Sequence, residues 1–128
     1  SLLYWDLYNR YMRYFKLKEF DSPDKPGSGQ LMDPFFLQLL DKARTHAQIP
    51  FKISSGYRTK EHNKKVGGVP NSSHLKGLAA DIVCNNSSDR YIILSALLHV
   101  GFHRIGISDS FIHADVSTDR PGFMVWTY

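Results

Sequence analysis

The chain has 128 residues, of which 42% are hydrophobic and 13% aromatic, and its formal net charge is +4 at pH 7. This length and composition indicate one compact domain that folds without covalent staples. The single cysteine, Cys84, excludes an internal disulfide and a cysteine-rich structural metal site. The mild positive charge suits an anionic polymer, but no basic run interleaved with aromatic residues supports nucleic-acid binding. No stretch approaches the ~20 apolar residues that span a bilayer, so we expect no membrane span.

The first predicted element is an aromatic-rich segment at residues 1–14. Its apolar residues recur at the spacing of one helix face: Leu3, Leu7, Tyr11 and Tyr14. We expect a short helix that docks on the main domain, which we place at residues 15–128. Residues 21–29 are rich in proline and glycine and predict a loop.

The second predicted element is a helix that begins after Asp33, because Asp is a good N-cap and Pro34 suits the first helical position. Its buried face is marked by Phe36, Leu37, Leu40 and Ala43 or Ala47. Residues 51–54 alternate and predict a strand. The polar stretch 56–73 predicts a long loop with some helical content at 60–65, and loops of this length in compact domains tend to be functional.

The remaining chain predicts more strands than helices. Residues 78–83 form an apolar run typical of a buried strand, and residues 89–100 predict a helix with Ser87 or Ser88 as its cap. Three further strands follow, at residues 104–107, 111–116 and 124–128. We expect them to form an antiparallel, meandering sheet. The sequence therefore predicts a small α+β fold, an antiparallel sheet flanked by helices.

Three polar residues stand out from their surroundings. Asp81 lies within an apolar strand, where a carboxylate must be paired, hydrogen-bonded or bound to metal. His113 is also polar in an apolar strand, and Gly77 allows the chain to turn so that His74 folds back over Asp81. Two imidazoles and one carboxylate form the ligand set of a zinc ion with an open fourth position. The structural alternatives are a buried Asp that accepts backbone N–H bonds and core histidines with satisfied rings.

A set of motifs in a fixed order resembles a known family. The motifs are Ser54-Ser55-Gly56-Tyr57-Arg58-Thr59, His62-Asn63, Val66-Gly67-Gly68-Val69, Ser73-His74 with Gly77, Ala79 and Asp81, Gly101-Phe102 with Arg104-Ile105-Gly106, and Phe111-Ile112-His113 with Asp115. From about Arg13 to Tyr128 the chain resembles the zinc D-Ala-D-Ala carboxypeptidases and related phage and bacterial murein endopeptidases. The resemblance implies a single zinc ion bound by His74, Asp81 and His113 in a cleft on the sheet.

The resemblance also implies catalytic roles. Arg58 matches an arginine that holds a substrate carbonyl or the developing oxyanion, a role that suits a fixed guanidinium; a solvated surface charge is the alternative. The family often places an acidic base three positions before the last ligand histidine, where this chain has Ser110, with Asp109 one position earlier. Asp115 shares a strand face with His113 and is the other candidate, either as the base or as a carboxylate that orients a ligand.

The function implied by the resemblance is zinc-dependent cleavage of peptidoglycan stem or cross-link peptides by a metal-activated water. The enzyme would be a D,D-carboxypeptidase or an endopeptidase, whereas residue chemistry alone indicates only metal-assisted amide hydrolysis. The alternative is a non-catalytic binding module that keeps zinc, as hedgehog signalling domains do. We expect a monomer that acts on peptidoglycan peptides in the bacterial periplasm or wall, or as a phage protein after lysis. Residues 1–5 are too short for a signal sequence, so we expect either a product that stays inside until cells lyse or a leader that has been removed.

Overall fold

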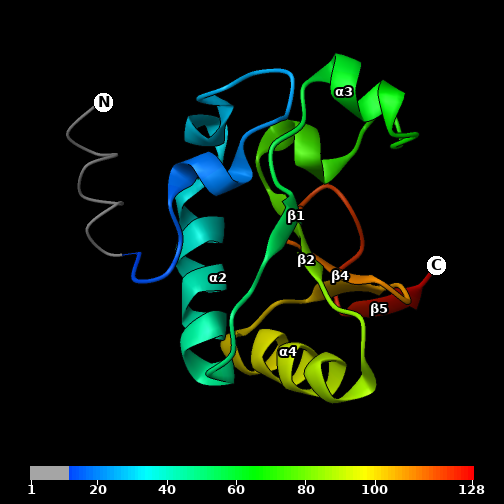
Figure 1. Ribbon diagram of the computed structural model, residues 1–128. Helices are drawn as coiled ribbons and strands as arrows, with labels where there is room; N and C mark the ends of the chain where they lie inside the picture. Colours follow the sequence, from blue (N-terminus) through cyan, green and yellow to red (C-terminus); the bar gives the residue numbers. More distant parts are fainter. Residues whose placement is uncertain (1–11) are drawn as a thin grey trace.

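The computed structural model describes residues 12–128 and shows the predicted α+β fold, a five-stranded sheet flanked by helices (Figure 1). The predicted docking helix at residues 1–14 lies almost wholly outside the described residues. The three of its residues that are described, 12–14, are not helical. Within the described part of the chain, no helix is both long and apolar enough to cross a membrane.

The described helices include three α-helices, each capped by the side chain of the residue before it. The helices are the 3-10 helices η1 (Leu17–Phe20), η2 (Ser28–Leu31) and η3 (Ser73–Lys76) and the α-helices α2 (Pro34–Ala47), α3 (Lys60–Lys65) and α4 (Ser87–Val100). The carboxylate of Asp33 accepts the Phe36 N–H at 2.9 Å, which confirms the predicted cap of α2. The predicted cap of α4 at Ser87 or Ser88 is wrong. Asn86 takes that position because its side chain accepts the Asp89 N–H at 2.8 Å.

The sheet is mixed rather than wholly antiparallel. Its strands are β1 (Ile53–Ser55), β2 (Ala79–Val83), β3 (Arg104–Ile107), β4 (Phe111–Asp115) and β5 (Met124–Thr127), in the spatial order β1-β2-β4-β3-β5. The prediction of a meander was wrong on two points, because β4 lies between β2 and β3, and β5 pairs with β3 in parallel. The segment between β4 and β5 can be short. β4 ends beside the start of β3, and β5 begins beside the same end of β3.

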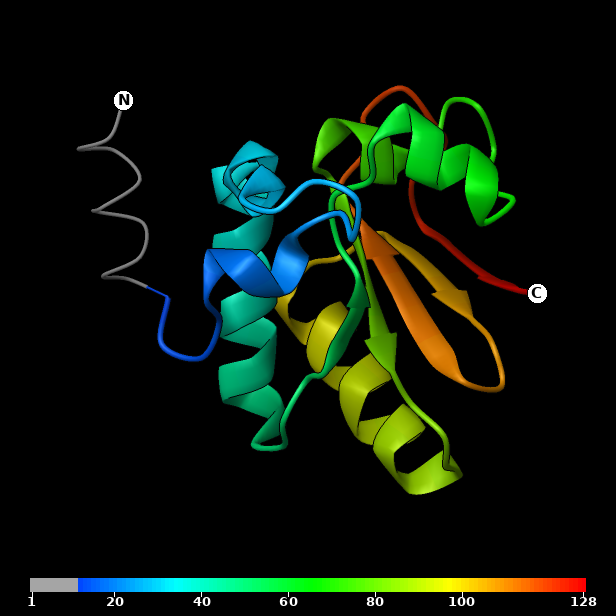
Figure 2. The same cartoon turned by 45° about the horizontal axis from the view of Figure 1, so that its top comes forward.

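The two faces of the sheet have different chemistry, because successive side chains of a strand point to opposite faces. One face is apolar and packs with α2 and α4, which lie on the same side of the sheet (Figures 1 and 2). This core contains Ala80, Ile82, Ile105, Ile112 and Ala114 from the sheet, Phe36, Leu37 and Leu40 from α2, and Ile93 and Leu97 from α4. The other face is left free for the polar residues of β2, β3 and β4.

The packing of the core predicts that truncation of two leucines will lower the free energy of unfolding by different amounts. Leu40 on α2 is fully buried, whereas Leu98 on α4 is 51% exposed. We expect Leu40→Ala to lower the free energy of unfolding by about 2–5 kcal/mol, through lost apolar burial and the cavity that remains. Leu98→Ala serves as the matched control in denaturant titrations without added metal. Equal losses for the two variants would contradict this assignment of the core.

Candidate metal centre and pocket

Strand pairing places two of the predicted ligands directly opposite each other. Asp81 of β2 and His113 of β4 are Cα partners in the antiparallel ladder. The Nδ1 atom of His113 lies 2.9 Å from Oδ1 of Asp81, and both residues are buried. Their shared face is the one turned away from α2 and α4, so the two side chains meet over the polar side of the sheet.

Helix η3 supplies the third predicted ligand. The Ser72 hydroxyl accepts the His74 N–H at 3.2 Å, and Gly77 ends the helix in the left-handed conformation at a φ of 69°. A side chain at Gly77 would also collide with the backbone at Leu31. The Nδ1 atom of His74 donates to the Gly56 carbonyl at 2.8 Å. This bond leaves Nε2 free to act as a ligand, and Nε2 faces Oδ1 of Asp81 at 3.4 Å.

These three residues fit a metal ion. One ligand atom from each of His74, Asp81 and His113 can be chosen so that all three lie within 4.8 Å of one another, and all three residues are buried. Their donor set, two imidazole nitrogens and a carboxylate oxygen, is one that zinc accepts while keeping a position open. The predicted grouping of the three side chains is therefore present in the fold.

The electrostatics of the cluster also favour a cation. Burial alone would raise the pKa of the Asp81 carboxyl, but hydrogen bonds and charge from His113 and His74 outweigh it and hold this pKa well below its usual range. Burial lowers the pKa of His113, yet its bonds to Asp115 and Asp81 raise that pKa above the ordinary value. An imidazole that donates from both nitrogens is protonated, so a metal ion that binds at Nδ1 displaces a proton.

The two candidate bases lie in different environments. Asp115 is 2% exposed, and its Oδ2 lies 2.8 Å from Nε2 of His113. Its other oxygen, Oδ1, accepts from Nε of Arg104 at 2.8 Å and from the Ser117 N–H at 3.1 Å. Asp109 lies in the turn between β3 and β4, is exposed, and is not among the residues that line the pocket over the cluster. The structure thus brings Asp115, and not Asp109, to the ligand cluster.

Arg58 is held beside the cluster by three contacts. Its Nε donates to the Ser55 hydroxyl at 2.9 Å, its Nη1 to Oδ1 of Asn63 at 3.2 Å, and its Nη2 lies 3.4 Å from Oδ2 of Asp81. Asn63 is itself buried and donates to the Val69 carbonyl at 2.8 Å. Since a guanidinium has five N–H donors, two remain for a bound molecule after these contacts. Arg58 is therefore an oriented part of the site rather than a solvated surface charge.

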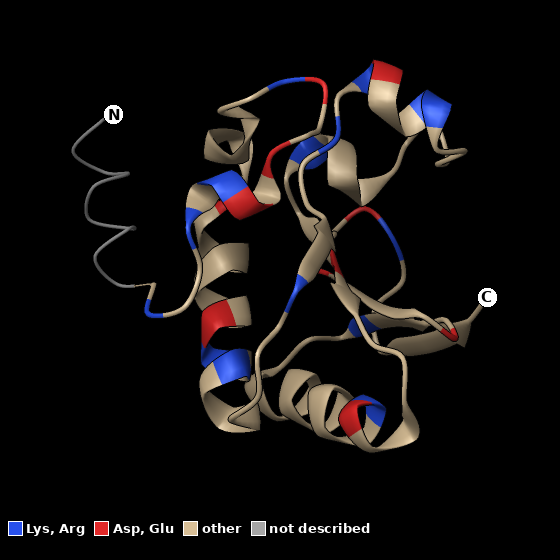
Figure 3. Ribbon diagram, in the orientation of Figure 1, with Lys and Arg blue, Asp and Glu red and all other residues tan. Residues whose placement is uncertain are grey.

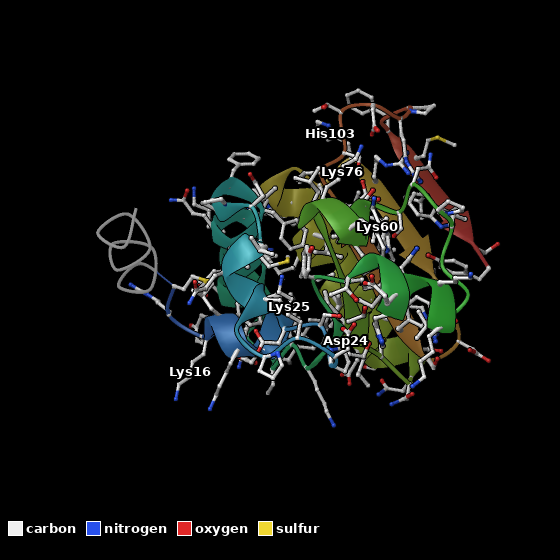
Figure 4. The ribbon with its side chains drawn as sticks, turned by 90° about the horizontal axis from the view of Figure 1, so that it is seen from above. Lys16, Asp24, Lys25, Lys60, Lys76 and His103 are labelled. Atoms are coloured by element: carbon white, nitrogen blue, oxygen red, sulfur yellow. The ribbon has the colours of Figure 1, made fainter. Side chains whose placement is uncertain are left out.

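A pocket of about 420 Å³ lies over the cluster. Its walls come from the loop that follows α3, from the segment after β4 and from β5, with Val69, Arg120, Trp126 and Tyr128 among the lining residues. Two contacts tie the segment after β4 to the loop and to η3. Lys76, labelled in Figure 4, pairs with Asp119 at 2.6 Å, and Arg120 donates to the Asn71 carbonyl.

The strand β5 contributes an aromatic wall through a close approach at Gly106. A Cβ atom on Gly106 would lie 2.5 Å from Nε1 of Trp126, so the indole rests directly on the β3 backbone. The ring centroids of Trp126 and His113 are 5.6 Å apart. Tyr128 lines the same pocket and is 70% exposed. Trp126 and Tyr128 therefore line the pocket.

A family model described as Peptidase M15 matches residues 14–115 of the chain. The chain belongs to the peptidase M15 family. The match contains Arg58 and all three residues of the ligand cluster, and it ends at Asp115. Membership confirms the predicted resemblance to the zinc D-Ala-D-Ala carboxypeptidases and supports a metallopeptidase. A comparison with curated proteins found no match.

The contacts of several residues around this M15 site were not predicted from sequence. Ser55 and Asn63 orient Arg58, and Arg104 binds Asp115. Each belongs to a motif that carried the resemblance, but only the fold shows which side chain each one contacts. One sequence signal was available at Gly106, since a glycine inside a strand often marks a close approach of another group. The distribution of charge does not point to the site, because acidic and basic residues are interspersed along the described ribbon (Figure 3).

Proposed function

We propose that this M15 peptidase is a zinc enzyme that cleaves peptidoglycan stem or cross-link peptides, as a D,D-carboxypeptidase or an endopeptidase. The observation that carries the proposal is the buried cluster of His74, Asp81 and His113 at the base of a pocket. Family membership supports peptide hydrolysis in general. The peptidoglycan substrate rests on the resemblance to the D-Ala-D-Ala carboxypeptidases and murein endopeptidases.

In this proposal three side chains hold the zinc ion. His74 binds through Nε2, because its Nδ1 donates to the Gly56 carbonyl. His113 binds through Nδ1, which faces Asp81, while its Nε2 donates to Asp115. Asp81 binds through its carboxylate. A zinc ion with three protein ligands supplies a water of lowered pKa as nucleophile and polarises the substrate carbonyl.

Arg58 stabilises the negative charge that develops on the carbonyl oxygen. Its two remaining N–H groups belong to Nη1, which is beside Asn63, and Nη2, which is beside Asp81, and Arg58 lines the pocket. The bonds that Arg58 donates to Ser55 and Asn63 fix the guanidinium plane before substrate arrives. A donor that needs no reorganisation during the reaction gives the greatest stabilisation of the transition state.

Asp115 orients the ring of His113 in the same proposal. Its Oδ2 accepts from Nε2 of His113, and its Oδ1 is occupied by Arg104 and the Ser117 N–H. A carboxylate with both oxygens engaged is better placed to fix a ligand histidine than to accept a proton from water. Asp109 lies in the exposed turn outside the pocket, and its role as the alternative base is tested with the variants below.

One observation favours a non-catalytic module as the second candidate function. The position three residues before His113 holds Ser110, which cannot act as a carboxylate base. The domain would then bind wall peptides or a protein through its zinc-containing pocket without turnover.

Defined muropeptides separate the two functions. We expect zinc-loaded protein to release terminal D-Ala or to split a cross-link, as followed by mass spectrometry, and EDTA to stop the reaction. The mass of the product also decides between exopeptidase and endopeptidase. Binding of the muropeptides without any product, across a range of zinc concentrations, would instead support the binding module.

Two matched variants test the carboxylates. We expect Asp115→Asn to weaken zinc binding about 10- to 100-fold, with activity that returns when zinc is raised, as for other partners of ligand histidines. Asp109→Asn, an equally small change in the exposed turn, should keep both zinc and activity. Zinc affinity and hydrolysis rates at rising zinc are the measurements. An inactive Asp109→Asn that still binds zinc would assign the base to the turn, and an Asp115→Asn with normal zinc but no activity would assign it to Asp115.

A further inference from the structure

Arg104 is an arginine whose burial calls for an explanation. It is 8% exposed, although it lies at the start of a strand beside the pocket. A buried guanidinium is costly unless it is paired and hydrogen-bonded. Its Nε bonds Asp115 at 2.8 Å, its Nη1 donates to the Pro121 carbonyl, and its Cζ lies 4.9 Å from the ring centroid of Trp126.

The contacts of Arg104 form a continuous chain to the ligand cluster. Arg104 of β3 and Asp115 of β4 are Cα partners, so the ion pair joins directly opposed residues. Asp115 and His113 share one face of β4, and their side chains are 2.8 Å apart. His113 in turn reaches Asp81 through Nδ1 at 2.9 Å. The order is therefore guanidinium, carboxylate, imidazole, carboxylate.

We propose that Arg104 is a positioning residue of the metal centre, which holds the Asp115 carboxylate in the one orientation that aims Nδ1 of His113 at the metal. This inference rests on the proposed zinc site. Without Arg104, the Asp115 side chain keeps only the Ser117 N–H on Oδ1 and can rotate. The His113 ring would then lose the fixed partner that sets its tautomer and its angle.

The surroundings of Arg104 hold its guanidinium in one orientation. Nε points to Asp115 and Nη1 to the Pro121 carbonyl, while the guanidinium lies against the Trp126 indole. The indole can lie there only because Gly106 has no side chain. A planar fork stacked on an aromatic ring is a geometry that lysine cannot reproduce. Arg104 is therefore built into the wall of the pocket.

The sign of the effect on zinc affinity tests the proposal. Removal of a nearby positive charge should strengthen the binding of a cation, if charge alone acted. Loss of a positioning contact should weaken it, by about 10- to 100-fold for an outer partner of a ligand histidine. We therefore expect Arg104→Met to bind zinc more weakly than wild type, as measured by competition with a chromogenic chelator.

Arg120→Met is the matched control, because Arg120 lines the same pocket but donates to the Asn71 carbonyl and not to the ligand network. We expect it to bind zinc as tightly as wild type, or more tightly. The double variant Arg104→Met/Asp115→Asn should be no weaker than Asp115→Asn alone, since both changes break one chain of contacts. Losses that multiply in the double variant would overturn the proposal.

Arg104→Lys covers the case in which Arg104→Met does not fold, as judged by circular dichroism without zinc. It keeps the buried charge but lacks the planar fork, and we expect a folded protein with weakened zinc binding. A folded Arg104 variant with wild-type zinc affinity would overturn the inference while leaving the zinc site intact. A wild-type protein that binds no zinc would instead overturn the proposed function.

Discussion

We expect Asp81→Asn to lose zinc and, with it, peptide hydrolysis. The carboxylate of Asp81 is the centre of the cluster, since its Oδ1 faces both Nδ1 of His113 at 2.9 Å and Nε2 of His74 at 3.4 Å. An amide has nearly the same shape but carries no negative charge for the cation. Metal bound only to the native state adds to its stability, by about 2.7 kcal/mol when free zinc is 100-fold above its dissociation constant. Asp81→Asn should lose most of this gain.

The measurements are zinc content and thermal unfolding with and without EDTA. Asp119→Asn is the control, because it removes an exposed carboxylate whose ion pair, among residues 12–128, is with Lys76 and not with the ligand cluster. The control should bind zinc and respond to EDTA as wild type does. If EDTA left the melting temperature of the wild-type protein unchanged, the three residues would be a structural hydrogen-bonded cluster and not a metal site.

The second large effect is expected at Arg58. Arg58→Lys should keep zinc yet lower kcat about 100- to 1,000-fold, the usual cost of losing one donor to the oxyanion. The reason is geometric, because a lysine ammonium cannot make the Ser55 and Asn63 contacts and still present two N–H groups to the pocket. Steady-state kinetics on a defined muropeptide, with zinc content measured in parallel, give the result.

Arg120→Lys is the matched control for this variant, since Arg120 also lines the pocket but binds the Asn71 carbonyl. We expect a much smaller change in kcat there. Asn63→Ala adds a second check, because Arg58 would keep its charge but lose one of the bonds that orient it. Full activity in Arg58→Lys would mean that Arg58 supports the structure of the pocket but does not stabilise the transition state.

Much of this fold could be predicted because local sequence decides it. Asp33 and Pro34 predict the start of α2, and the residues between Arg104 and Ile107 predict β3 with its observed bounds. The direction of β5 could not be predicted in this way. It depends on which end of β3 the segment after β4 reaches, and this is a property of the folded sheet.

In the candidate site, too, some features could be predicted from local sequence and others depend on the fold. Asp81 and His113 are polar residues in apolar strands, so burial alone makes them conspicuous in the sequence. His74 lies on a short helix, and its place in the cluster was indicated only by the turn at Gly77 and by the family motif. The Arg104–Asp115 ion pair depends on the register of two strands, which no local pattern specifies. Contacts between side chains on different strands therefore had to come from the fold.

The position of β4 between β2 and β3 also sets the order in which the protein can mature. His74 and Asp81 precede α4 and β3 in the chain, whereas His113 follows them, on the strand that pairs with β2. Long-range pairing of this kind is slow to form, because the intervening chain must first be closed into a loop. A partly synthesised chain that ends before β4 would lack both the third ligand and one of the two strands that pair at Asp81. We therefore expect zinc uptake to accompany the pairing of β4 with β2, so that an intermediate without this pairing carries no complete metal centre.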